Sequence, residues 1–239
     1  PIIQGPYGPA SLVAEGLVAL TENGKKVLVS PDGRVLSEAG VSNVTPNEPG
    51  FVNLEDRGKF GLYAIATEQL IAPTYTAPLT VYSDTLAVAT KGGRSGFVGL
   101  PGGFTSKFSY DEVKHFSDTL AFVRSAGSDL WQLVSVGSGQ VHMEGIGHID
   151  PYLTRPGNGV SYATIFVDTK WGAVNNQGEL VVPADYDIIL NLGDEETPLF
   201  FTGQQEGPDE APLGYRVEYI SPKGNPLLQT RYSITNFDI

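Results

Sequence analysis

The chain has 239 residues, and its 41% of hydrophobic residues with abundant glycine (29) and proline (17) is typical of one all-β domain rich in short strands and turns. A formal net charge of −12 argues against binding to nucleic acid or an anionic membrane, because both need lysine and arginine at the contact. The absence of cysteine excludes disulfides and thiolate metal sites, and no apolar run reaches the roughly 18–20 residues needed for membrane insertion.

A repeat of about 35–40 residues runs along the chain. Its clearest trace is the segment Ser83–Ala87, which recurs as Ser117–Ala121 at an offset of 34 residues (117 − 83). Equivalent segments are rich in β-branched and aromatic residues and are too short for helices. They predict six strands, at residues 17–20, 51–54, 83–87, 117–121, 164–167 and 199–201.

A second predicted strand follows each of these after a tight polar turn. The six are residues 26–29, 59–63, 96–100, 131–134, 170–174 and 215–220. Five of them then meet a hairpin turn with glycine, which supplies the positive φ that short hairpins require. A third strand follows, which often ends in Pro shortly before Tyr, as at Pro73–Tyr75 and Pro183–Tyr186. A short fourth strand completes the unit.

The ends of the chain indicate how the repeats are joined. The last predicted unit lacks its fourth strand, whereas residues 9–24 precede the first unit without partners. The simplest completion is circular, so we predict a closed six-bladed β-propeller whose N-terminal strand completes the last blade. The alternative is an open β-repeat superhelix. The chain is treated as a single repeat domain, 1–239, with units at 25–58, 59–94, 95–129, 130–169, 170–214, and 215–239 plus 9–24.

The unit that begins at Lys170-Trp171-Gly172 resembles the bacterial WG repeat, also called KWG. It carries that repeat's Gly turn at 176–179 and its Pro183 to Asp187 segment, and weaker copies surround Phe60-Gly61 and Gly96-Phe97. The resemblance implies a bacterial interaction module without a common activity, and it transfers no catalytic residue. Trp131 and Trp171 occupy equivalent positions, with Phe60 at another, which favours core anchors over a ligand platform.

The largest departures from the repeat are two acidic insertions and the segment Thr154–Gly159. Insertions in repeat proteins tend to form surface loops, which carry binding more often than the scaffold does. The binding candidates are therefore Asp194, Glu195, Glu196, Asp209 and Glu210, as a patch for a cationic partner or a weak Ca²⁺ site. The alternative is a solvated acidic loop, since the spacing of a calcium loop is absent.

Metal binding and nucleophilic catalysis have little support in the sequence. His142 and His148 are six residues apart, which is too far along one strand for a single ion unless the glycines between them bend the chain. We therefore expect no metal, no cofactor and no catalytic residue. The enzyme alternative is a carbohydrate-active hydrolase with paired carboxylates in a propeller channel, drawn from Glu55, Asp56, Asp129 and Asp168.

These observations favour a non-enzymatic binding or scaffolding module that recognises a protein or glycan partner through loops on a rigid β-repeat ring. We expect a monomer without nucleic-acid binding or membrane insertion. The start at Pro1 without methionine fits either removal of a leader or trimming of a longer chain. A bacterial periplasmic or extracellular location is slightly favoured over the cytoplasm, and the compartment stays open.

Overall fold

The computed structural model describes residues 8–14, 16–37, 40–100, 103–150, 161–193, 198–207 and 213–232. The secondary structure of these residues consists of strands and turns without any helix, which confirms the predicted all-β class. Accordingly, the described segments include no helix long and apolar enough to cross a bilayer. The chain divides into two compact units, Pro1–Val113 and Lys114–Ile239, each with its own apolar clusters.

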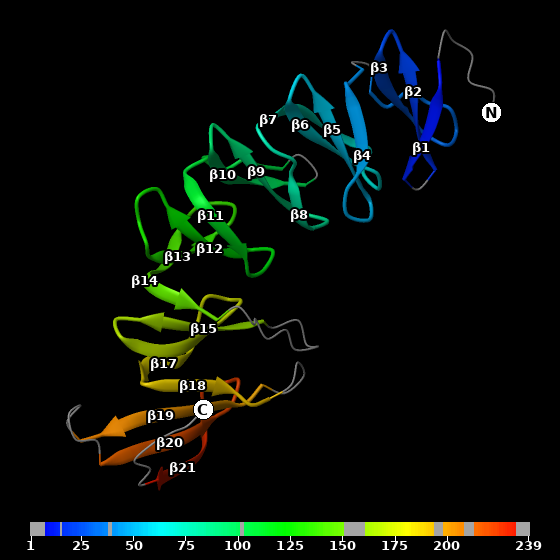
Figure 1. The fold of residues 1–239 in the computed structure, drawn as a ribbon. Coiled ribbons are helices and arrows are strands. Elements are labelled where there is room, and N and C mark those ends of the chain that lie inside the picture. The colour runs from blue at the N-terminus through cyan, green and yellow to red at the C-terminus, as the bar shows by residue number, and fades with distance from the viewer. Residues whose placement is uncertain are drawn as a thin grey trace. The chain divides into compact units, whose positions relative to one another are not determined.

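The strands of the first unit fall into three successive antiparallel groups, which we call sheets one to three (Figure 1). Sheet one consists of β1 (Ala10–Ala14), β2 (Leu17–Glu22) and β3 (Lys25–Val29), with bridges from Val35 and Val41 beside β3. Sheet two consists of β4 (Asn43–Pro46), β5 (Phe51–Asp56), β6 (Lys59–Ala64) and β7 (Gln69–Tyr75). Sheet three consists of β8 (Thr80–Ser83), β9 (Leu86–Lys91), β10 (Arg94–Gly99) and the start of β11 (Tyr110–His115), where Tyr110 pairs with Ser95.

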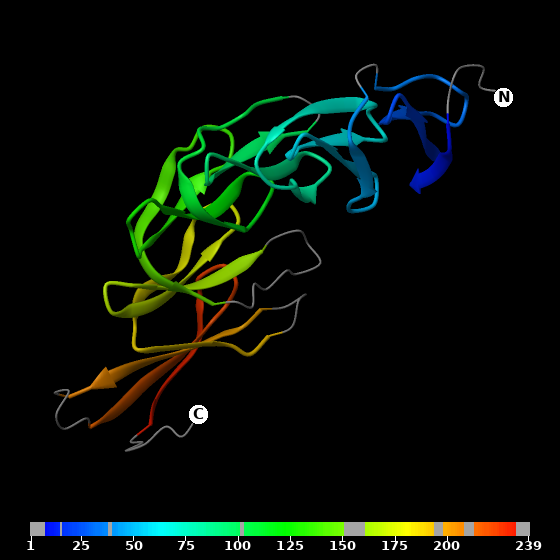
Figure 2. The same ribbon diagram turned by 45° about the horizontal axis from the view of Figure 1, so that its top comes forward.

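The second unit repeats this arrangement, and in both views the strands of its last sheet lie side by side (Figures 1 and 2). Sheet four consists of the end of β11, β12 (Leu120–Ser125), β13 (Trp131–Ser135) and the first half of β14 (Val141–Ile149). Sheet five consists of the second half of β14, β15 (Tyr162–Val167), β16 (Lys170–Asn175) and β17 (Leu180–Tyr186). Sheet six consists of β18 (Ile188–Asn191), β19 (Phe200–Glu206), β20 (Gly214–Ile220) and β21 (Pro226–Tyr232).

Each of these sheets takes its strands in sequence order, from a first to a fourth position, although in sheet one the fourth position holds only the bridges from Val35 and Val41. Strand pairing is continuous from β8 to β17, so sheets three to five are parts of one 10-stranded sheet in which β11 and β14 each belong to two parts. Because neighbouring strands are antiparallel, the turn between the first and second strands and the turn between the third and fourth lie at the same end of the sheet. We call this the outer-turn end. The hairpin between the second and third strands lies at the opposite, middle-turn end.

The pairing of the N-terminal strands corrects one expectation. β2 pairs with β1 on one edge and with β3 on the other, and the β2–β3 hairpin closes tightly at Asn23 and Gly24, both at positive φ. Sheet six takes all four of its strands from residues 188–232. The prediction that the N-terminal strand completes the last blade is therefore wrong in this structure. β18 supplies the first strand of sheet six, and local hairpin pairing places β1 and β2 in sheet one.

The Trp-Gly motif marks a bulge in the sheet. Trp171 pairs with Tyr186 and Ala173 pairs with Val182, so three residues of β17 lie opposite the single residue Gly172. A Cβ at Gly172 would lie 2.8 Å from the carbonyl oxygen of Val182. In sheet two, a Cβ at the equivalent Gly61 would lie 2.3 Å from a carbonyl oxygen of β7. The glycine is therefore required by the close approach of the fourth strand.

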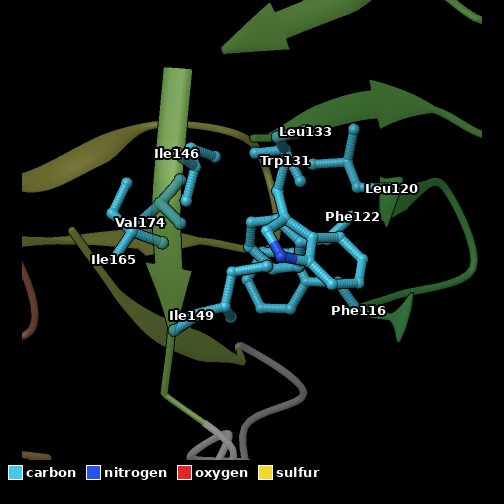
Figure 3. Close-up of a cluster of buried hydrophobic side chains, with 10 residues drawn as sticks. Phe116, Leu120, Phe122, Trp131, Leu133, Ile146, Ile149, Ile165 and Val174 are labelled. Carbon is cyan, nitrogen blue, oxygen red and sulfur yellow. The ribbon is translucent and has the colours of Figure 1, made fainter. Parts of the chain in front are cut away.

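Apolar side chains fill the space between successive sheets within each unit. Between sheets four and five, the side chains of Ile146 and Val174 point toward those of Phe116, Phe122 and Trp131 (Figure 3). Trp131 is 7% exposed within this cluster, and Trp171 packs against the cluster between sheets five and six. Both indoles therefore lie in core packing, as the structural interpretation of the repeated aromatic residues predicts.

Candidate functional site

A hollow lies in the second unit, at the outer-turn end of sheets four and five. Its volume is about 520 Å³. It is lined by the turn before β12, by the residue before β15 and by the turn after β16. The lining residues are His115, Phe116, Ser117, Asp118, Thr119, Ser161, Asn176 and Gln177. We call it the Asn176 hollow.

The turn before β12 is organised by the hydroxyl of Ser117. This oxygen accepts hydrogen bonds from the backbone N–H groups of Thr119 (3.3 Å) and Leu120 (3.1 Å), as short polar side chains do in tight turns. The N–H of Val136 donates to the carbonyl of Thr119 at 2.8 Å and joins the turn to the end of β13. Asp118, at the tip, is exposed. The backbone of this wall is thus held in place by Ser117, while the side chains of Asp118 and Thr119 are exposed.

The turn after β16 is organised by the buried side chain of Asn175. Its Oδ1 accepts hydrogen bonds from the N–H groups of Gln177 (3.0 Å) and Glu179 (2.9 Å), while its Nδ2 donates to Glu179 at 2.8 Å. The N–H of Asn176 donates to the carbonyl of Ser161 at 2.9 Å and joins this turn to the start of β15. Two walls of the hollow are therefore braced by hydrogen bonds.

The floor of the hollow is apolar and its walls are polar. Phe116 is 1% exposed, and its ring packs 5.0 Å from that of Phe122 in the core cluster (Figure 3). Around it the walls offer hydroxyl, amide and imidazole groups with the single carboxylate of Asp118. Such groups donate hydrogen bonds to polar ligands and accept hydrogen bonds from them.

A smaller hollow of about 190 Å³ occupies an equivalent place in the first unit. It is lined by Glu48, Pro49, Phe51 and residues 81–84. The hydroxyl of its Ser83 lies 3.1 Å from that of the neighbouring Thr85, as the hydroxyls of Ser117 and Thr119 lie 3.3 Å apart in the larger hollow. The repeated Ser-Asp-Thr triplet therefore marks a recurrent outer turn as well as the start of a strand. Burial raises the pKa of Tyr82 in this smaller hollow.

The acidic binding candidates Asp194, Glu195, Glu196, Asp209 and Glu210 lie outside the described residues. The described residues that flank the two segments are at opposite ends of β19. Leu192 and Leu199 are hydrogen bonded at 2.8 Å at the outer-turn end, and Leu213 and Glu206 at 2.7 Å at the middle-turn end. A seven-residue strand separates these positions by about 20 Å. We therefore treat the two insertions as separate candidates.

The four carboxylates proposed for hydrolysis lie at the middle-turn ends of three different sheets. Lys25 and Ser42 donate hydrogen bonds to Asp56 at 2.9 and 2.8 Å and hold its pKa below the usual value. Asp129 and Asp168 are exposed in separate hairpins. None of these side chains lines either of the two hollows described above.

The histidines of β14 have separate surroundings. His142 Nε2 lies 2.7 Å from the hydroxyl of Ser135, whereas the His148 ring meets the edge of Trp171 at 5.7 Å. Gly145 adopts a positive φ between them and forms part of a bulge opposite Gln132. No group of three or more His, Cys, Asp or Glu side chains with metal-binding geometry occurs among the residues that the structure describes.

Sequence reasoning missed the Asn176 hollow. The sequence predicts only the start of a strand at Ser117–Thr119 and only a hairpin turn at 176–178. The sequence does contain one signal, the exact repetition of the polar triplet Ser-Asp-Thr at a turn. Strand formation alone does not require these three residues to be repeated. Ser161 is forty-two residues from Thr119 in sequence (161 − 119). The two residues line the same hollow because sheets four and five lie next to each other.

Comparisons with solved structures give weak likenesses. Hsv2 of Kluyveromyces lactis is 8% identical over 86% of this chain and 70% of that chain, with a TM-score of 0.35. Virginiamycin B lyase from Staphylococcus aureus is 15% identical over 97% and 85%, with a TM-score of 0.30. PorZ of Porphyromonas gingivalis is 10% identical over 92% and 31%, with a TM-score of 0.32. With TM-scores this low, the likenesses carry no argument about closure or activity.

Sequence comparison is more informative. No curated protein matches the chain. Residues 171–194, however, match the family described as WG containing repeat. The match begins at Trp171, beside the bulge that makes Gly172 necessary, and extends through β17 and β18. The resemblance seen in the sequence is thereby confirmed, and the chain carries a WG-containing repeat at residues 171–194.

Proposed function

We propose that the protein is a non-enzymatic binding module that recognises a protein or glycan partner at the outer-turn end of its sheets. The observation that carries the proposal is the Asn176 hollow, with an apolar floor and hydrogen-bonding walls on braced turns. Binding sites combine a concave surface with a few fixed polar groups in this way. Bracing also supports binding, because walls that are already ordered lose little conformational entropy when a ligand enters.

The lining indicates which contacts a partner makes. Ser117, Thr119 and Ser161 offer hydroxyls, and Asn176 and Gln177 offer amides, so the site suits a ligand with many hydroxyl or amide groups. A saccharide and an extended peptide both meet this requirement. The closed ring predicted from the repeats stays a prediction, and binding at a hollow formed within the second unit does not depend on it.

The test begins with a glycan array and a displayed random-peptide library, screened with the purified protein. The best hit is then titrated calorimetrically against wild type and the double variant Asn176→Ala/Gln177→Ala. We expect at least a tenfold loss of affinity, which corresponds to about 1.4 kcal/mol and fits the removal of one or two good hydrogen bonds. Asp168→Asn, in an exposed turn at the opposite end of sheet five, is the matched control and should bind as wild type does.

Two results would contradict the proposal. One is a hit whose affinity is unchanged in the double variant, because the ligand would then bind elsewhere. The other is cleavage of the bound saccharide or peptide by the purified protein, which chromatography of the reaction products would detect.

A further inference from the structure

The walls of the Asn176 hollow present side-chain groups to a ligand, because much of their backbone is already hydrogen bonded within the protein. The N–H groups of Ser117, Thr119, Asn176 and Gln177 all donate hydrogen bonds within the chain, and the carbonyl oxygens of Thr119 and Ser161 each accept one. The hollow also lies at turns, where strands end, and not along the edge of a sheet. An extended peptide that adds to a sheet pairs with backbone N–H and C=O groups along an edge strand. The position and the bonding of these walls disfavour that mode of binding.

The side-chain groups of the walls suit a ligand rich in hydroxyl groups. The hydroxyls of Thr119 and Ser161 can each donate and accept, and the amides of Asn176 and Gln177 each carry a donor and an acceptor side by side. A sugar hydroxyl also donates and accepts, so two neighbouring hydroxyls of one sugar ring match the two ends of an amide. The walls therefore favour a saccharide over a peptide.

The charge of the hollow favours a saccharide without charge. Among the described residues that line it there is one carboxylate, Asp118, and no lysine or arginine. The chain carries a net charge of −12, so an anionic sugar would be repelled by Asp118 at close range and by the chain as a whole. A cationic side chain would gain little from a single exposed carboxylate. Neutral hydroxyls, by contrast, donate strong hydrogen bonds to a carboxylate.

The floor of the hollow is closed by a ring that is almost fully buried. Phe116 is 1% exposed, and its ring packs 5.0 Å from that of Phe122. Binding must therefore depend on hydrogen bonds to hydroxyl groups more than on stacking of a sugar ring against an aromatic face. A site of this kind rejects an analogue that lacks one contacted hydroxyl, because the protein group that met it is left unpaired.

We propose that the ligand of the Asn176 hollow is a neutral saccharide, whose hydroxyl groups bind to the polar walls and to the carboxylate of Asp118. This inference rests on the proposed function and narrows it to one class of ligand. The volume of about 520 Å³ lies within the range of about 300–1,000 Å³ that is usual for small-ligand sites, so a short stretch of saccharide fills it.

The experiment compares three classes of ligand on the full chain. An array of neutral, sialylated and sulfated glycans is screened beside a displayed peptide library, and neutral glycans should bind. Lactose, maltose and diacetylchitobiose, together with the sugar at the end of the best array hit, are then titrated calorimetrically. Asp118→Asn should bind the best of these about tenfold more weakly than wild type. Asp129→Asn is the matched control, because it neutralises an exposed aspartate at the opposite end of sheet four and should bind as wild type does.

Two further readouts identify the contact with Asp118. Affinity for a neutral sugar should not change with ionic strength, whereas the affinity of a cationic peptide would fall as salt screens the attraction. In a series of monodeoxy derivatives, the one that lacks the hydroxyl bound by Asp118 should lose about as much affinity as Asp118→Asn loses. Combining that derivative with that variant should cost no more than either change alone.

The outcomes separate this inference from the proposed function. A peptide whose binding is lost in Asn176→Ala/Gln177→Ala, with no neutral glycan bound, would overturn the saccharide and leave the hollow as a binding site. A preference for sialylated or sulfated glycans would overturn it in the same way, as would equal affinity of Asp118→Asn and wild type, with circular dichroism showing both folded. A glycan bound equally well by wild type and the double variant, or no hit in either screen, would contradict the proposed function and this inference with it.

Discussion

Replacing Gly172 with alanine tests the explanation of the Trp-Gly motif. The added Cβ would lie 2.8 Å from the carbonyl oxygen of Val182 and 3.0 Å from the Cα and N of Ala184. All three are backbone atoms of the bulged strand β17, so relief requires movement of β17. Overpacking of this kind costs about 1–3 kcal/mol. For a chain of this size, each kcal/mol lowers the melting temperature by about 2–4 °C, so Gly172→Ala should melt about 2–12 °C lower.

Intrinsic tryptophan fluorescence is the appropriate assay, because both indoles, Trp131 and Trp171, belong to the second unit. Gly147→Ala is the matched control. It also lies within a strand of that unit, but its Cβ would meet only ordinary contacts at 3.7 and 3.8 Å. It should melt at the wild-type temperature or slightly above, since alanine restricts the unfolded chain more than glycine does. Equal melting temperatures for Gly172→Ala and wild type would refute the steric explanation.

Three further predictions concern other parts of the chain. Gly61→Ala should destabilise the first unit more than Gly172→Ala destabilises the second. The added Cβ would lie 2.3 Å from the nearest carbonyl oxygen at position 61 and 2.8 Å from it at position 172. Differential scanning calorimetry of the two variants measures which one melts at the lower temperature. Burial, and then the hydrogen bond that Tyr186 donates to Glu218, raises the pKa of Tyr186 to about 12 from 10.0. The folded state keeps this proton when the unfolded state loses it, so the resulting stability is complete below pH 10 and lost between pH 10 and 12. Tyr186→Phe should show a shallower fall of melting temperature in that window, and parallel curves would contradict the assignment. The last prediction concerns the four middle-turn carboxylates, neutralised one at a time in Glu55→Gln, Asp56→Asn, Asp129→Asn and Asp168→Asn. Each variant should bind the ligand found by screening with wild-type affinity, within the error of calorimetric titration.

Local patterns predicted much of the fold because the determinants of a hairpin are local. The recurring segments rich in β-branched and aromatic residues, together with the turn residues, predict the second and third strands of each sheet, such as 164–167 and 170–174, which pair as expected. Trp171 and Gly172 also identified the WG repeat. The assignment of residues 9–24 failed because sequence alone does not show which neighbour a strand pairs with. The short β18 was also not recognised as the first strand of sheet six.

The candidate site was less accessible to sequence reasoning for a physical reason. The acidic insertions attracted attention by their charge, whereas the Asn176 hollow consists of ordinary serine, threonine and amide residues. Its polar walls become a site only when Ser161 and Asn176 of sheet five lie beside the outer turn of sheet four. That proximity depends on stacking between sheets, and neither residue carries a signal of it in its own sequence neighbourhood.

Hydrogen–deuterium exchange with the best array or library hit bound tests the central claim most directly, because it reports which end of the sheets is covered. The account predicts slower exchange in residues 115–119 and 175–178, at the outer-turn end of sheets four and five. It predicts no change in residues 126–130 and 168–170, at the middle-turn end. Protection confined to the middle-turn end, with unchanged exchange at Ser117 and Asn176, would contradict it.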